Sequence, residues 1–253
     1  MKYTIRLCRT QDELAACVGL QKRIWGYSDL EVYPLRLFVN LGKIGGHVIG
    51  AFGPRRQVVG FVAAMPAWRR GRRYLYSLSL GVLPSHENRG LGRALKIAQR
   101  RAALEAGIEL IEWTFDPLQA RNAYFNIVRL GAIARRFLAN HYGPVASRLQ
   151  QRRPSDRLVA EWWLKSPRVR RALDGRSASP TAKPVAATVE IPRTIAALVK
   201  KSSRQAREKQ ERVGKELIRH FARGLATTGF AVSKRLGAYL LSRLSEPGIP
   251  RGA

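Results

Sequence analysis

The order of apolar runs and helical patterns is the feature that most constrains the fold of this chain. Short apolar runs occupy residues 45–52, 58–67 and 74–83. The turn sequences GPRR at 53–56 and RRGRR at 69–73 separate these runs, so the strands they predict can pair as hairpins. Strand–helix–strand patterns then follow. This order predicts an α/β (α+β) fold with a central mixed, mostly antiparallel sheet flanked by helices.

Further elements are expected around these strands. Residues 3–7 alternate as a short strand, and Thr10 with Glu13 has the form of a capping box that opens a helix through about Trp25. The other expected elements are a helix with Leu91, Leu95, Ala98 and Ala102 on one face, a strand at 108–115, a short helix around 122–130 and a strand at 158–164.

Composition predicts a main domain at residues 1–174 and a smaller C-terminal part. Residues 175–188, GRSASPTAKPVAAT, have the composition of a linker. Residues 189–245 form a basic extension, and we expect residues 246–253 to be a flexible tail.

The extension is expected to fold as a helix followed by a β-hairpin. Over residues 203–222, Val213, Leu217 and Phe221 recur every four residues on one face, and the opposite face is rich in arginine. Residues 229–243 then show two apolar runs about a basic turn, which is typical of a hairpin.

The chain is strongly basic. It has 46 Lys and Arg against 17 Asp and Glu, a formal charge of +29. Such an excess indicates an anionic partner, namely nucleic acid, a membrane surface or a phosphate-rich cofactor. The excess is spread along the chain, and the sequence has no recognisable nucleic-acid-binding motif. Nucleic acid is therefore an alternative partner without motif support, and an acidic acceptor is also compatible with the charge.

Cysteine and histidine usage predicts no metal site. Cys8 and Cys17 have no disulfide or metal-binding spacing, and the four histidines are scattered. The N-terminus lacks the apolar run of a signal peptide, and no segment is long and apolar enough to span a bilayer. These features predict a cytoplasmic protein.

Residues 81–96, GVLPSHENRGLGRALK, have the pattern of an anion-binding loop: an apolar strand, a short glycine loop and a helix start. Backbone N–H groups over residues 88–93 would lack helical partners and could point at one anion. Two glycines allow close approach to the backbone, and two arginines add positive charge. The alternative is that the glycines only turn the chain. The candidate binding residues are Asn88, Arg89, Gly90, Leu91, Gly92 and Arg93.

These residues carry a family resemblance. Val82-x-Pro84 followed by residues 87–92, ENRGLG, resembles the acetyl-coenzyme A loop of the GNAT acyltransferase superfamily, V-x-P-x-x-[Q/R]-x-x-G-x-[G/A]. The resemblance extends over residues 3–165, because the order of elements also matches. Residues 113–132, WTFDPLQARNAYFNIVRLGA, resemble a bacterial branch of predicted acetyltransferases that has a similar C-terminal helix and hairpin.

The resemblance implies acetyl-coenzyme A as the acyl donor. It implies that the loop amides bind the pyrophosphate and that the preceding strand splays from its neighbour. The backbone at Leu80 and Val82 would then pair with the pantetheine arm and polarise the thioester carbonyl. Glu87 stands where the family has Gln or Arg, and we expect this carboxylate to face solvent.

Acyl transfer to an amine needs a base for the amine and an acid for the departing thiolate. Glu112 and Asp116 bracket the end of the strand expected beside the splayed one, so we predict that one of them acts as the base through a water. The alternatives are that Glu112 is a solvated strand residue and that Asp116 caps a turn before Pro117.

The thiolate acid departs from the family pattern. The resemblance implies a Tyr four residues before Gly131, but Ile127 stands there. Tyr124 lies seven residues before Gly131 and could substitute if the helix is shifted; the alternative is that it packs in the core. Asn122 could bind the pantetheine arm or cap the helix.

The sequence thus favours an acyltransferase that moves an acetyl group from acetyl-CoA to an amine. Two alternatives stay open. One is a catalytically weak CoA-binding scaffold, and the other is a basic nucleic-acid- or ribosome-associated protein. A homodimer is also left open.

Overall fold

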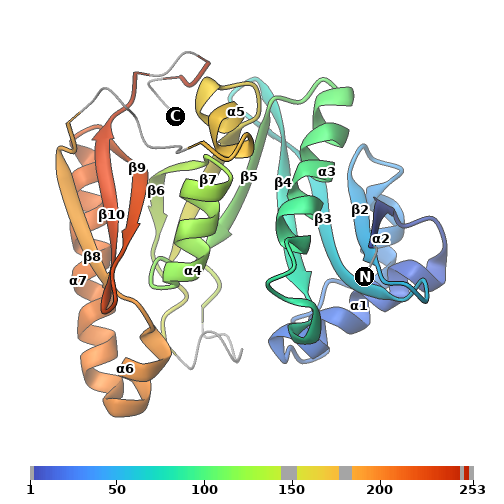
Figure 1. The fold of residues 1–253 in the computed structure, drawn as a ribbon, viewed down its shortest axis with the longest axis horizontal. Helices are drawn as coiled ribbons and strands as arrows, with labels where there is room; N and C mark the ends of the chain where they lie inside the picture. The colour runs from blue at the N-terminus through green and yellow to red at the C-terminus, as the bar shows by residue number, and fades with distance from the viewer. Residues whose placement is uncertain (1–2, 144–152, 177–183, 246–247, 251–253) are drawn as a thin grey trace. The chain divides into compact units, whose positions relative to one another are not determined.

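The computed structural model describes residues 3–143, 153–176, 184–245 and 248–250. Figure 1 shows the path of the chain. The described residues form two compact units, which divide between Glu112 and Trp113. Each unit has its own strands and helices and is described by itself.

The first unit is built on an antiparallel meander. Its strands follow one another in the order of the sequence, and each pairs antiparallel with the next up to β4. The next strand, β5, pairs parallel to β4 through Leu75 with Ile111 and Tyr76 with Glu112. The strands are β1 (Thr4–Leu7), β2 (His47–Phe52), β3 (Val58–Arg69), β4 (Arg72–Val82) and β5 (Leu110–Phe115).

Helices cover the sheet of this unit. They are α1 (Gln11–Trp25), α2 (Leu35–Leu41) and α3 (Leu91–Glu105), and α3 lies against β2, β3 and β4 (Figure 1). All six residues of β2 are buried. Because successive side chains of a strand point to opposite faces, both faces of the sheet are covered at β2. This arrangement buries the apolar runs that predicted the strands.

The predicted capping box opens α1. The Thr10 hydroxyl accepts a hydrogen bond from the Glu13 N–H at 3.2 Å, and the Glu13 carboxylate accepts one from the Arg9 N–H at 2.6 Å. The helix ends at Trp25, as expected, before Gly26 with a φ of 71°. Cys8 and Cys17 are free thiols, and Cys17 is buried in the core of this unit.

The second unit carries the remaining strands and the C-terminal extension. Its strands are ordered β7–β6–β9–β10–β8, and the pairs β6–β7, β6–β9, β9–β10 and β10–β8 are antiparallel. The elements are α4 (Ala120–Ala123), a π-helix (Tyr124–Arg129), β6 (Ile133–Leu138), β7 (Arg157–Trp163), α5 (Pro167–Leu173), β8 (Ala187–Pro192), α6 (Ile195–Lys201), α7 (Ser203–Ala222), β9 (Leu225–Val232) and β10 (Leu236–Arg243).

The predicted C-terminal helix and hairpin are both present. Helix α7 spans the expected residues, with Val213 and Leu217 fully buried. Strands β9 and β10 form the hairpin, and β10 also pairs with β8. The fold class, a mixed and mostly antiparallel sheet flanked by helices with a C-terminal helix and hairpin, is confirmed.

The division at Glu112 differs from the boundary expected at residue 174. The reason is that the extension adds its strands to those of the second unit, where Thr227 of β9 pairs with Ala134 of β6. The last residues of the expected linker, 187–188, belong to β8. Much of the linker (177–183) and of the tail (246–247, 251–253) lies outside the described residues.

Candidate active site

The glycine loop connects β4 to α3 by a short and unusual path. A 3-10 helix at Pro84–His86 follows β4, and Asn88 and Gly90 then have left-handed φ values of 59° and 76°. Gly90 is the N-cap of α3 and offers no side chain to cap it. The first turn of a helix leaves backbone N–H groups without helical acceptors. The loop therefore has the backbone geometry of an anion site at a helix start.

The loop is anchored on one side and accessible on the other. Leu91 is buried in the core of the first unit, whereas Asn88, Arg89 and Gly90 are exposed. The Arg89 guanidinium donates to the Tyr3 hydroxyl at 3.0 Å and to the Ser85 carbonyl at 3.2 Å. Gly92 and Arg93, in the first turn of α3, are partly exposed. All six predicted loop residues thus lie around one helix start.

The carboxyl half of β4 lies beyond its ladder with β5. That ladder ends at Tyr76, whereas pairing with β3 continues through Leu80 and Val82. A bulge interrupts the β3–β4 register between Ala63 and Ala64. Bulges bend and twist a strand locally. This geometry is compatible with the predicted splay of β4, which stays a prediction.

Glu87 is partly buried in the loop. Its N–H donates to the Pro84 carbonyl at 3.2 Å and closes the 3-10 helix. The side chain is neither fully solvated nor fully enclosed. The expected outward orientation of its carboxylate stays a prediction.

Glu112 is buried and bound to an arginine. Both carboxylate oxygens accept hydrogen bonds from Arg69, at 2.6 and 2.8 Å, and the Arg69 guanidinium lies 5.1 Å from the Tyr74 ring centroid. Bidentate pairs of this kind are among the stronger hydrogen-bonded contacts in proteins. To act as a base, Glu112 would have to share this arginine with a water.

Asp116, in the second unit, both caps a turn and joins a buried network. One carboxylate oxygen accepts from the Leu118 N–H at 2.8 Å, and the other accepts from Arg153 at 3.1 Å. Arg153 is 3% exposed and also donates to Gln210 of α7 at 2.7 Å. The turn-capping alternative is therefore realised in the structure, and the role as a base stays a prediction.

The segment expected to supply the thiolate acid is a π-helix. Tyr124 begins it and is 40% exposed, whereas Ile127 is buried. Asn122 is exposed on α4. Gly131 has a φ of 75°, and an added Cβ would lie 3.0 Å from the Arg168 carbonyl oxygen. Backbone conformation and packing therefore both require glycine at the position where the family pattern has it.

A buried polar cluster lies beneath α3 and was missed by the sequence analysis. The Lys96 ammonium donates to Gln99 at 2.6 Å, and Gln99 contacts Ser77 of β4 at 3.2 Å. Burial holds the pKa of Lys96 well below its usual value. The one sequence signal for this cluster was Lys96, which directly follows Leu95 on the apolar face of the expected helix.

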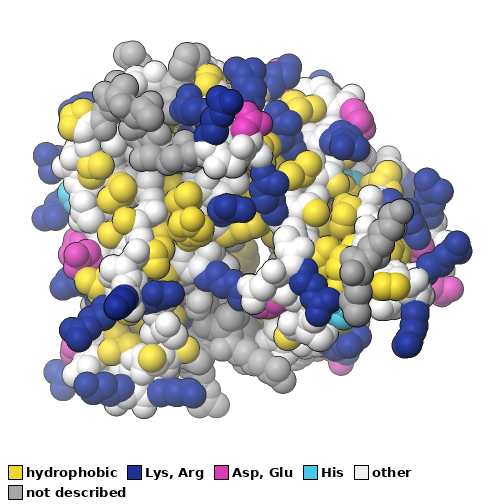
Figure 2. Space-filling view, viewed as in Figure 1, with side chains coloured by type: hydrophobic (Ala, Val, Ile, Leu, Met, Phe, Trp, Pro, Cys, Tyr) yellow, Lys and Arg dark blue, Asp and Glu magenta, His cyan; other side chains and the backbone are white. Residues whose placement is uncertain are grey.

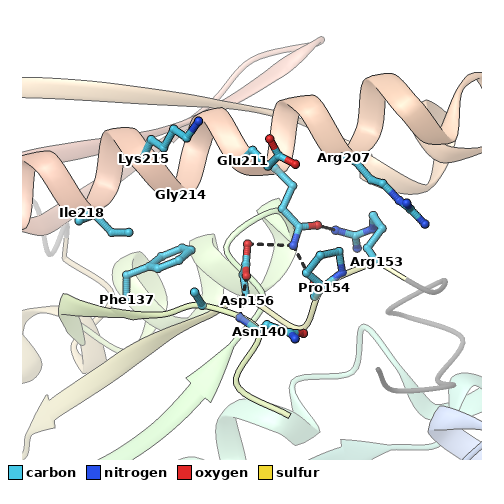
Figure 3. A pocket seen from close by; sticks show the side chains of 12 residues that line it. Phe137, Asn140, Arg153, Pro154, Asp156, Arg207, Glu211, Gly214, Lys215 and Ile218 are labelled. Carbon is cyan, nitrogen blue, oxygen red and sulfur yellow. Dashed lines mark hydrogen bonds between the residues drawn. The ribbon is translucent and has the colours of Figure 1, made fainter. Parts of the chain in front are cut away.

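Each unit has a groove on its described surface, and no predicted site residue lines either of these grooves. Figure 3 shows the groove of the second unit, between α7 and the chain around Asn140 and Pro154. Its volume is about 640 Å³. Arg153 lines it and also binds Asp116. The groove of the first unit, of about 700 Å³, lies beside β1 and the β2–β3 turn.

Charge and composition of the described residues add three observations. Figure 2 shows Lys and Arg side chains spread over the viewed face rather than gathered in one patch. Among the described residues, no three His, Cys, Asp or Glu side chains cluster as metal ligands. No helix in the described part of the chain is long and apolar enough to cross a membrane.

Comparisons with known proteins identify the same family as the loop motif. Residues 14–126 match the acetyltransferase (GNAT) family. No curated protein sequence matches the chain.

Several solved structures share the fold. A structure from Desulfovibrio desulfuricans, described as a GNAT-family acetyltransferase, is 18% identical with a TM-score of 0.52 and covers 64% of this chain and 99% of that chain. Arabidopsis thaliana NAA60 in complex with acetyl-CoA is 14% identical with a TM-score of 0.51 and covers 64% of this chain and 99% of that chain. At these identities the structures show a common fold. The match of residues 14–126 to the acetyltransferase (GNAT) family includes the glycine loop, and the shared fold agrees with this match.

Proposed function

We propose that the protein transfers an acetyl group from acetyl-CoA to an amine by direct attack. The observation that carries the proposal is the loop between β4 and α3. It presents a helix start with Gly90 and Gly92, at which a ligand can come close to the backbone. Its amides and the Arg89 and Arg93 side chains would hold the pyrophosphate of the donor. Backbone groups of Leu80 and Val82, beyond the β5 ladder, would pair with the pantetheine arm.

The reaction requires a neutral amine. Its nitrogen attacks the thioester carbonyl carbon, the N–C bond forms and the C–S bond breaks. The proton lost by the amine passes through a water to Glu112 or Asp116, and the coenzyme A thiolate takes a proton from an acid, for which we propose Tyr124. Arg69 at Glu112 and Arg153 at Asp116 keep each carboxylate in place for this step.

The pairing of Glu112 with Arg69 makes a clear demand on this mechanism. A carboxylate bound to arginine at two oxygens is a weaker base than a solvated one, because the ionised form is stabilised. The amine must therefore arrive already neutral or lose its proton on desolvation. Asn122, exposed on α4, would contact the pantetheine arm.

The acceptor is proposed only as a class. The charge of +29 favours an acidic amine-bearing acceptor, because a positive surface raises the local concentration of anions. The two free thiols suit a reducing compartment, which supports a cytoplasmic location.

The test is calorimetric titration of acetyl-CoA into wild type and a Gly90→Asp/Gly92→Asp variant. Two carboxylates in the glycine loop should weaken acetyl-CoA binding at least about tenfold, because they repel the pyrophosphate. The control is Gly19→Asp/Gly42→Asp, which adds the same charge at glycines with no atom within 4 Å of an added Cβ. If both variants bind like wild type, the loop is only a turn and the proposal fails.

A second candidate is a CoA-binding protein without efficient catalysis. The observation that favours it is buried Ile127 at the position where the family pattern has its acid. Binding does not separate the two candidates, so thiol release must be measured with panels of amines. Donor binding without thiol release for any amine would favour this second candidate.

A further inference from the structure

The hairpin that joins β3 to β4 ends in a compact basic tip. Its connecting residues, Arg70 and Gly71, both have positive φ, 49° and 73°. This is the signature of a tight two-residue hairpin turn, in which glycine and asparagine are the usual residues. An arginine in the left-handed region is uncommon because of its Cβ. The tip therefore holds a cation in a strained backbone conformation on a tight two-residue turn.

An indole ring is exposed beside these cations. Trp68 is 65% exposed, the highest value among the exposed aromatic side chains of the described residues. It pairs across the hairpin with Arg73, which is also exposed, and cross-strand partners point to the same face. The exposed surface of the tip consists of Trp68, Arg70, Arg72 and Arg73, which we call the Trp–Arg tip.

The base of the tip is fixed by the neighbouring pair. Arg69 and Arg72 are cross-strand partners, and Arg69 is held by both oxygens of Glu112. No Asp or Glu occurs in the sequence between Glu31 and Glu87. Strands β2, β3 and β4 therefore contribute cations and no carboxylates. Because Glu112 of β5 offsets Arg69, the positive charge of the tip comes from Arg70, Arg72 and Arg73.

The Trp–Arg tip is separate from the glycine loop. Strand β4 carries the tip at its start and the loop after its end, and its 11 residues span roughly 33 Å. A ligand that fills the loop would not reach the tip. A partner of the exposed indole and its arginines would therefore be separate from the acyl donor.

We propose that the Trp–Arg tip binds single-stranded nucleic acid. The indole offers a face on which an unpaired base can stack, and the arginines on the same turn offer contacts to the adjacent phosphates. A duplex hides the faces of its bases. Insertion into a membrane depends on buried apolar area, and Trp68 is the only large exposed apolar side chain of this tip.

The test measures fluorescence anisotropy of a labelled oligodeoxythymidylate of about 20 nucleotides with the full chain. At ~150 mM salt, Trp68→Ala should weaken binding roughly tenfold, and Trp68→Phe should keep most of it because phenylalanine also stacks. Arg70→Gln/Arg72→Gln/Arg73→Gln should reduce the slope of log K against log salt by about 2.

The matched control removes the same charge from α7, with Arg207→Gln/Lys215→Gln/Arg219→Gln. These three residues are exposed, so the variant tests general attraction to a basic protein. Thermal unfolding of each variant establishes that it is folded. Acetyl-CoA binding by the tip variants should equal that of wild type, which keeps this proposal distinguishable from the acyl-donor site.

Four results would overturn the proposal. They are no binding by wild type at ~150 mM salt, equal losses in the tip and α7 variants, unchanged binding in Trp68→Ala, and equal affinity for the duplex of the same sequence. Vesicles with anionic lipid serve as the remaining comparison. Trp68-dependent binding to vesicles without binding to the oligonucleotide would identify a membrane surface instead.

Discussion

At the residue scale, the buried polar cluster beneath α3 is unusual for a core. His47, Ala64 and Ser77 form one row across β2, β3 and β4, so their side chains share the face that Gln99 contacts. Ala64 is the middle residue of this row, and the polar side chains of His47 and Ser77 lie on either side of it. The His47 Nε2 atom is buried and has no hydrogen-bond partner within the described residues. Burial without a hydrogen-bond partner disfavours the charged form of the His47 imidazole.

The pH dependence of stability follows from His47. Burial, with a smaller contribution from Lys96, lowers the pKa of His47 from 6.5 to about 4. Between these values the unfolded chain binds a proton that the folded chain does not, so stability falls as the pH falls from 6.5 to 4. The loss should be on the order of 2–3 kcal/mol.

Urea unfolding of wild type and His47→Gln at several pH values measures this effect. The variant keeps a polar side chain at the position but cannot titrate, so its stability should fall less over this window. Parallel curves for the two proteins would show that His47 makes no contribution.

At the element scale, one buried glutamine of α7 links this helix by hydrogen bonds to the chain at residues 153–156. Gln210 accepts from Arg153 and donates to the Pro154 carbonyl at 2.7 Å and to Asp156 at 2.9 Å, contacts that Figure 3 shows in part. Through Arg153 the same network reaches Asp116. The extension therefore helps to hold a residue for which we propose a catalytic role.

Gln210→Leu tests this attachment. Leucine has a similar volume but leaves the buried Arg153 with one partner fewer, so the free energy of unfolding should drop by about 2 kcal/mol. Gln205→Leu, at an exposed position of the same helix, is the control and should change stability by less than about 0.5 kcal/mol. Equal effects of the two substitutions in urea unfolding would contradict the structural role of the network.

At the scale of the whole molecule, the net charge is the dominant feature. A formal charge of +29 on 253 residues repels itself in the compact state. Ion pairs among the described residues offset only part of it, and several of them are solvent-exposed. Added salt screens this repulsion between like charges, so it should stabilise the folded protein.

Thermal unfolding at ~20 mM and ~300 mM sodium chloride measures this repulsion. Relief of about 1 kcal/mol would raise Tm by about 2–4 °C in a protein of this size. A Tm that stays constant or falls with salt would show that the charges are spaced widely enough to be independent. A sulfate salt is unsuitable, because sulfate can bind at the glycine loop.

Much of the fold and part of the candidate site could be predicted because the signals are local. Alternation, turn residues and the Thr10–Glu13 box depend on neighbours in sequence, and they placed β1–β4, α1 and α7. The glycine loop was found for the same reason, since a helix start needs only consecutive residues. Strands β6 and β8 and helices α2, α5 and α6 were missed, because their apolar patterns are short. The two strands also depend on pairing with segments that are distant in the chain.

The sequence by itself determined the fold class, the basic charge and the position of the loop at the start of α3. Only the tertiary structure decided that Arg69 binds Glu112, that Arg153 joins Asp116 to α7, and that Trp68 is exposed beside Arg73. Each of these contacts joins residues that are separated in sequence or depends on which face of a strand is covered. Hydrophobic periodicity predicts which face of one helix or strand is buried. The residues that a side chain contacts, and its final exposure, depend on how the elements pack together.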